Sequence, residues 1–69
     1  MKAVSGKALG RALKRHGWVL KRIKGSHHIY EHADHIGTTI SVPMHGNRSL
    51  RTGTQHSIMK ASGLTEADL

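Results

Sequence analysis

The chain has 69 residues, no cysteine and a formal net charge of +7 at pH 7, with a sequence pI of about 10.7. This length allows one small domain, expected to span residues 1–69, whose core supplies only about 3–5 kcal/mol of net stability. The composition excludes disulfides and thiolate zinc sites. No apolar run exceeds Trp18-Val19-Leu20, so we expect no membrane span and no secretory signal, and a cytoplasmic protein.

The positive charge is unevenly distributed. Eight of the eleven Lys and Arg residues lie between Lys2 and Lys24, a stretch without any acidic residue. Such a one-sided field attracts a polyanion: nucleic acid, an anionic membrane or an acidic protein. A solvated basic surface is the simpler alternative, but this charge density favours nucleic acid.

The first element in chain order is a helix that begins at Gly6 and stops at Gly17. Ser5 is a favourable N-cap, and apolar residues recur at the i, i+3, i+4 spacing of one helix face. The apolar positions are Ala8, Leu9, Ala12 and Leu13, and the opposite face carries Lys7, Arg11, Lys14 and Arg15. This helix should therefore cover a sheet with one face and present cations with the other.

Residues 18–24 have a β period and form the first expected strand, with Leu20 and Arg22 on the same face. Gly25-Ser26 then makes a tight turn. Because neither strand face is wholly apolar, one side of the sheet should pack against helices and the other should face water.

The second strand is expected from His27 to His32, which places the side chains of His27 and His28 on opposite faces. Thr38 to Val42 is rich in β-branched residues and forms the third strand, which ends at Pro43.

A polar, basic loop over residues 44–51 leads to a second helix. Thr52 and Gln55 are typical of a capping box, the helix runs to about Ala61, and Gly63 is its stop. The order α-β-β-β-α predicts an α+β fold of two layers. We expect a three-stranded antiparallel sheet with both helices on one face.

The candidate active site lies around the first turn. Metal-free RNA cleavage needs a base for the ribose 2′-hydroxyl, a cation for the phosphate and an acid for the leaving 5′-oxygen. An imidazole, with an unperturbed pKa of about 6.5, suits the first or third role. His27 lies in reach of Arg22 and Lys24 on the paired strand, so it is the candidate catalytic residue, and an ordinary surface histidine of the strand is the simpler alternative. The predicted phosphate-binding residues are Arg22, Lys24, Gly25 and Ser26.

Two other histidines remain open as participants. His28 faces the helices and is structural if His27 faces the substrate. The alternation does not decide which strand face packs against the helices. Each face carries one histidine and one large side chain: Ile29 lies on the face of His27, and Tyr30 lies on the face of His28. His45 follows the third strand and is either a second proton-transfer group or an ordinary loop histidine.

Seven histidines also raise the question of metal binding. His27, His28, His32 and His35 lie close in sequence, with Glu31 and Asp34 among them. These residues scatter over two strand faces and a turn, and no helical His-x-x-x-His pair occurs. We expect no metal and no other cofactor.

The cations of the first helix suit either an RNA backbone or an acidic protein, and the sequence does not choose between them. Trp18 and Tyr30 could stack on bases. With so few aromatic residues in the chain, both are expected in the core instead.

The ordered motifs resemble a known family. They are Gly17-Trp18, Arg22-x-Lys24-Gly25-Ser26-His27-His28-x-Tyr30, Val42-Pro43-x-His45, Gly53-Thr54 with Ile58, and Ala61-x-Gly63-Leu64-Thr65. Together they are similar to HicA-type (YcfA-like) toxins, the ribonuclease half of a bacterial toxin–antitoxin pair. The resemblance covers nearly the whole chain, from Ser5 to Leu69.

The resemblance implies a fold similar to the double-stranded-RNA-binding domain, cleavage of mRNA, and neutralisation by a HicB-type antitoxin. It also implies that the catalytic histidine closes the Gly-Ser-His motif, which corresponds to His27. Because members differ in which of the two positions after Gly-Ser carries the histidine, His28 is the alternative.

Three functions therefore compete. The first is a metal-independent endoribonuclease acting on mRNA, the second a non-catalytic RNA-binding module of the same fold, and the third a subunit that docks an acidic partner. The presence of His27 favours the endoribonuclease over the RNA-binding module, because a non-catalytic module does not need an imidazole beside two cations.

Overall fold

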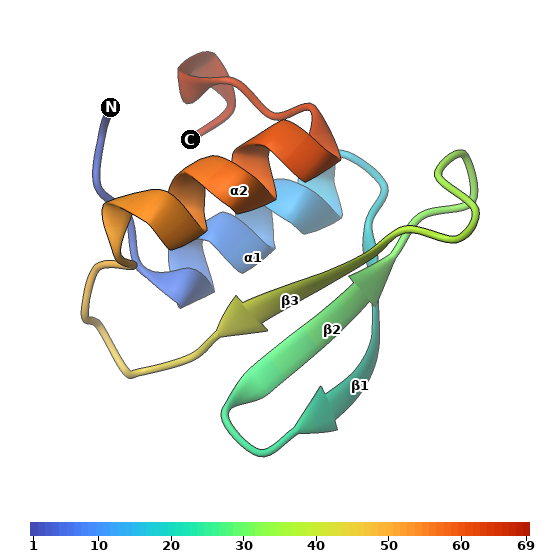
Figure 1. Cartoon of the computed structure of the whole chain (residues 1–69), viewed down its shortest axis with the longest axis horizontal. Helices are drawn as coiled ribbons and strands as arrows, with labels where there is room; N and C mark the ends of the chain where they lie inside the picture. The colour runs from blue at the N-terminus through green and yellow to red at the C-terminus, as the bar shows by residue number, and fades with distance from the viewer.

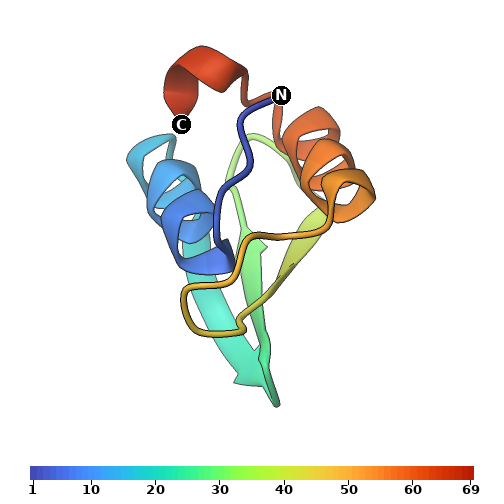
Figure 2. The ribbon, with the colours of Figure 1, turned by 90° about the vertical axis from the view of Figure 1, so that its left-hand side faces the viewer.

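The computed structural model describes residues 1–69 and has extents of 28 × 28 × 19 Å. The elements are α1 (Gly6–Arg15), β1 (Val19–Lys24), β2 (His27–Glu31), β3 (Thr39–Pro43), α2 (Thr52–Ser62) and the 3₁₀ turn η1 (Glu66–Asp68). Both helices cover one face of the sheet (Figure 1), and in Figure 2 the two helices stand on either side of the view with the strands between and below them. The predicted two-layer α+β fold is confirmed. Neither helix meets the length and hydropathy that crossing a membrane requires.

The sheet is antiparallel, and its strand order is the same as the chain order, β1-β2-β3. Tyr30 of β2 lies between Leu20 and Ile40, and His28 lies between Ile23 and Val42. Tyr30, Ile40 and Val42 are buried, so this set of positions faces the helices. His28 therefore faces the helix layer.

A bulge in β1 changes which side chains share a face. The register shifts between Leu20, which is opposite Tyr30, and Arg22, which is opposite Ile29. The extra residue, Lys21, reverses the alternation after it. Leu20 and Arg22 therefore lie on opposite faces, and the expectation that they share one is wrong.

The core lies between the sheet and the two helices. Leu9 and Leu13 of α1 are fully buried, and Trp18 and Tyr30 are each 2% exposed. Burying a large apolar side chain contributes about 1.5–3 kcal/mol, so these residues hold α1 on the sheet. The expectation that both aromatic residues belong to the core is confirmed.

The predicted capping residues are found at α1 and at the end of α2, but not at the start of α2. The Ser5 hydroxyl accepts a hydrogen bond from the Ala8 N–H at 3.1 Å, as its N-cap role predicts. In α2 the N-cap is Arg51, which makes no side-chain cap bond, so the capping box from Thr52 to Gln55 is wrong. Gly63 does stop α2, with a left-handed φ of 77°.

The Gln55 side chain binds the backbone of the N-terminal segment and not the start of its own helix. Its side chain is 1% exposed and accepts a hydrogen bond from the Val4 N–H at 3.1 Å. Its amide nitrogen donates to the carbonyl oxygen of Lys2. Gln55 thus ties the N-terminal segment to α2 instead of capping its own helix.

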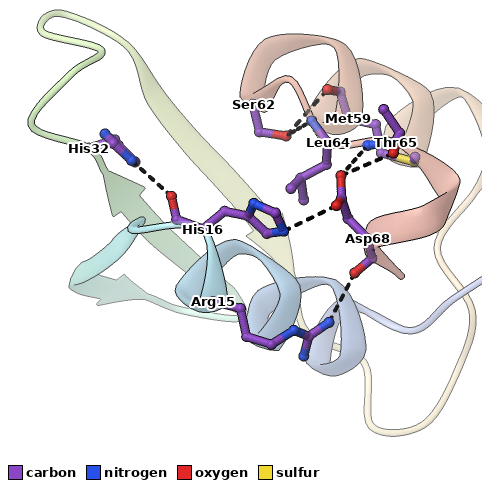
Figure 3. Close-up of polar contacts among 8 residues, drawn as sticks. All are labelled: Arg15, His16, His32, Met59, Ser62, Leu64, Thr65 and Asp68. Atoms are coloured by element: carbon purple, nitrogen blue, oxygen red, sulfur yellow. Dashed lines mark hydrogen bonds and ion pairs between the residues drawn. The ribbon is translucent and has the colours of Figure 1, made fainter.

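The C-terminal turn packs on the end of α1 (Figure 3). Arg15 donates a hydrogen bond to the Asp68 carbonyl oxygen at 2.9 Å, and His16 Nε2 lies 3.2 Å from Asp68 Oδ1. The other carboxylate oxygen of Asp68 accepts hydrogen bonds from the Thr65 N–H and hydroxyl. A single carboxylate therefore caps η1 and joins it to α1.

Candidate active site

The loop over residues 44–51 runs from β3 to α2 past the first turn of α1 (Figure 1). At its start, the Met44 N–H donates to the Ser26 carbonyl oxygen at 2.7 Å. At its end, the Leu50 N–H donates to the Val4 carbonyl oxygen at 2.8 Å, and Ser49 forms a bridge with Ser5. The loop is therefore fixed to both the Gly25-Ser26 turn and the N-terminal segment.

This arrangement creates an open groove of about 490 Å³ beside the start of β2, here called the His27 groove. It is lined by His27, Pro43, His45, Arg48, Ser49, Leu50, Arg51 and Thr54. His27 pairs with Pro43 across the sheet, and His45 lies two residues beyond Pro43. The backbone pairing thus brings the two histidines to one groove.

The His27 groove combines proton carriers with positive charge. It contains two imidazoles and two guanidinium groups, of Arg48 and Arg51, and no acidic side chain. Arg51 is also the N-cap of α2, where no side chain caps the first N–H groups. The positive end of the helix dipole adds to the arginine charges. Such a groove suits a phosphate group and can transfer a proton beside it.

The predicted phosphate ligands are brought together in part. Because of the bulge, Arg22 and Lys24 lie on the same outer face as His27, and Lys24 is directly opposite it. Neither cation lines the His27 groove. Gly25 and Ser26 form the exposed turn beside it. Arg22 and Lys24 therefore lie on the outer face of the sheet next to the groove, and not in it.

A second groove, of about 330 Å³, lies between α1 and the sheet and is here called the His28 groove. It is lined by Lys7, Gly10, Arg11, Lys14, His28, Tyr30, Met44 and Gly46. His28 is half-buried there, whereas His27 is exposed. The two neighbouring histidines therefore open into two different basic grooves.

The remaining histidines near the sheet have structural contacts. The ring centroids of His32 and His35 lie 5.2 and 5.0 Å from that of Trp18. The Asp34 N–H donates to His32 Nδ1, so Nε2 of His32 carries the proton and donates to the His16 carbonyl oxygen at 2.9 Å (Figure 3). No three His, Asp or Glu side chains come together as a metal site would require.

Arg48 and Arg51 are the groove residues that sequence reasoning did not single out. The available signal was the basic character of the loop over residues 44–51, which indicated charge but not direction. Their convergence on His27 depends on the Met44–Ser26 hydrogen bond and on the start of α2, and a one-dimensional pattern shows neither.

Comparison with known proteins agrees with this architecture. A search of curated proteins finds no match. The family model described as the HicA toxin of bacterial toxin–antitoxin systems matches residues 6–64, from the start of α1 to just beyond α2. That span includes both grooves and all three strands. The chain therefore belongs to the HicA toxin family of bacterial toxin–antitoxin systems.

Proposed function

We propose that this toxin is a metal-independent endoribonuclease that cleaves mRNA and is neutralised by a HicB-type antitoxin. The observation that supports it most is the His27 groove, where His27 and His45 lie beside Arg48 and Arg51. Cleavage of RNA without a metal needs one base, one acid and a cation. This groove offers all three chemical groups.

In this mechanism, His27 takes the proton of the ribose 2′-hydroxyl. The 2′-oxygen attacks the adjacent phosphorus, and the bond from phosphorus to the 5′-oxygen breaks. His45 gives a proton to that leaving oxygen, so the products are a 2′,3′-cyclic phosphate and a 5′-hydroxyl. Arg48 and Arg51 stabilise the negative charge that builds on the phosphate.

His28 is the alternative catalytic residue. It lies among Lys7, Arg11 and Lys14 in the other groove, so it also has an imidazole beside cations. His27 is favoured because its groove supplies a second imidazole, whereas the His28 groove contains a single one.

The experiment measures cleavage of single-stranded RNA by purified protein in excess EDTA, with melting curves for each variant. His27→Ala should remain folded and lose about 10²–10⁴ in rate, and His45→Ala should also lose activity. His56→Ala is the control, because His56 is exposed on α2 and lines neither groove. A 2′-O-methyl RNA should not be cut, since it lacks the attacking hydroxyl.

Growth provides the second measurement. Expression of the toxin should arrest bacterial growth with loss of intact mRNA, and His27→Ala should relieve the arrest. Coexpression of a HicB-type protein should do the same. A folded His28→Ala that is inactive, beside a His27→Ala that still cuts, would assign the chemistry to the other groove. Binding without any cleavage by the parent protein would leave a non-catalytic RNA-binding module.

A further inference from the structure

The His28 groove has features that the proposed chemistry does not use. Three cations line it from one face of α1, Lys7, Arg11 and Lys14. They are exposed and have no acidic partner. The ion pairs in the structure involve Glu66 and Asp68 and none of these three cations.

These cations form a row along α1. Lys14 is seven positions after Lys7, which corresponds to about 10.5 Å along a helix axis. Each of the three cations can therefore contact a phosphate of an RNA strand that follows the row.

The floor of the groove supplies a second, independent sign of a ligand. Tyr30 is 2% exposed, and its side chain lines the groove. No buried side-chain polar atom lacks a hydrogen-bond partner, so the Tyr30 hydroxyl, which bonds to no protein group, is accessible from the groove. Burial of the ring raises the pKa of this phenol, so the hydroxyl keeps its proton and remains a donor. A free hydroxyl donor in a basic groove suits an anionic oxygen.

The two grooves are also adjacent. His45 lines the His27 groove, while Met44 and Gly46 line the His28 groove. His27 and His28 are likewise neighbours, with Cα atoms about 3.8 Å apart. Residues 43–46 and the start of β2 thus form a wall that both grooves share.

We infer that the His28 groove is a second RNA-backbone site, in which Lys7, Arg11, Lys14 and the Tyr30 hydroxyl hold phosphates next to the one cleaved in the His27 groove. This inference rests on RNA as the proposed substrate. RNA is favoured over an acidic protein because the cations form a row beside a hydroxyl donor, and because this groove shares a wall with the groove in which the RNA is proposed to be cut.

The test measures binding of a 2′-O-methyl RNA of about 12 nucleotides, a length within known single-strand site sizes, by fluorescence anisotropy at several salt concentrations. This probe is not cleaved, so the readout does not depend on activity. The combined variant Lys7→Gln, Arg11→Gln, Lys14→Gln should reduce the slope of log affinity against log salt by about 2, at about 0.7 per lost phosphate contact.

The matched control removes the same charge elsewhere, by Lys2→Gln, Lys21→Gln and Lys60→Gln, none of which lines either groove. It should nearly keep the parental slope. Tyr30→Phe should bind about tenfold more weakly with an unchanged melting temperature, because it loses one hydrogen bond to a charged acceptor and no bond to the protein.

An unchanged slope in the first triple variant, or an equal loss in the control, would overturn the site. So would full affinity in Tyr30→Phe. Cleavage assays on the same proteins separate this result from the proposed function. Cleavage with no slope change refutes only the second site, and a slope change without cleavage by the parent refutes only the nuclease.

Discussion

Gln55 is a polar side chain at the centre of an apolar core. It is 1% exposed and holds both the Val4 N–H and the Lys2 carbonyl oxygen. Replacing it with alanine leaves these backbone groups without their partner, which costs about 1–3 kcal/mol. Gln55→Ala should therefore lower the free energy of unfolding by at least that amount, measured by urea denaturation.

The neighbouring residue provides the control. His56 is exposed on the same helix, so His56→Ala should change stability by no more than about 0.5 kcal/mol. Equal urea midpoints for the two variants would show that the Gln55 contacts add nothing.

Gly10 permits the close approach of α1 to Tyr30. A Cβ atom at position 10 would lie 2.6 Å from the Tyr30 hydroxyl oxygen, whereas one at Gly53 of α2 would meet open space. Gly10→Ala should destabilise the protein by about 1–3 kcal/mol through overpacking. Gly53→Ala should be neutral or stabilising by up to about 1 kcal/mol. Calorimetric melting of both variants checks this, and a Gly10→Ala protein as stable as Gly53→Ala would contradict the packing.

At the scale of elements, the Asp68 carboxylate of η1 makes the stability of the protein depend on pH. Hydrogen bonds from the Thr65 backbone and hydroxyl, together with the nearby charges of His16 and Arg15, lower the pKa of Asp68 below its ordinary value of 3.8. A lowered folded-state pKa means that stabilisation is present above pH 3.8 and is lost as the pH falls through the lower value.

Asp68→Ala should therefore melt at a lower temperature than the parent near neutral pH, and the difference should shrink at pH values below 3.8. Melting curves across that range are the measurement. A difference that is constant with pH would mean that the carboxylate charge is not what holds η1.

The elements themselves followed from the sequence, and the exceptions have physical causes. The Ser5 cap and the apolar spacing predicted α1, the β pattern predicted the strands, and Gly63 predicted the end of α2. The bulge at Lys21 was not predictable, because a single inserted residue leaves the local β pattern intact while reversing every face after it. The capping box at Thr52 failed because a tertiary contact with the N-terminal segment takes up Gln55.

The candidate site was predictable to the level of residue type and region. The sequence singled out His27, His28 and His45, and the structure shows that His27 and His45 share a groove while His28 lies in another. Which cations accompany each histidine depended on the bulge and on the path of the loop over residues 44–51. Neither has a local sequence signal.

For the molecule as a whole, charge opposes folding. The formal net charge is +7, and two clusters of cations line the grooves. The Debye screening length falls from about 30 Å at 0.01 M to about 8 Å at 0.15 M ionic strength. Because this weakens the repulsion between the cations, added sodium chloride should raise the melting temperature. Phosphate at equal ionic strength should raise it further, because an anion that binds only the folded state stabilises it. Equal melting temperatures in the two salts would argue against anion binding in the grooves.

The order of the strands also influences the order in which contacts form when the chain folds. Both strand pairs join neighbours in sequence, whereas Val4 and Gln55 are 51 residues apart. Contacts between distant residues cost the most loop-closure entropy and tend to form after local ones. Gln55→Ala should then speed unfolding and leave the folding rate nearly unchanged. The time for which a toxin molecule stays folded would thus be set by an amide that lines neither groove.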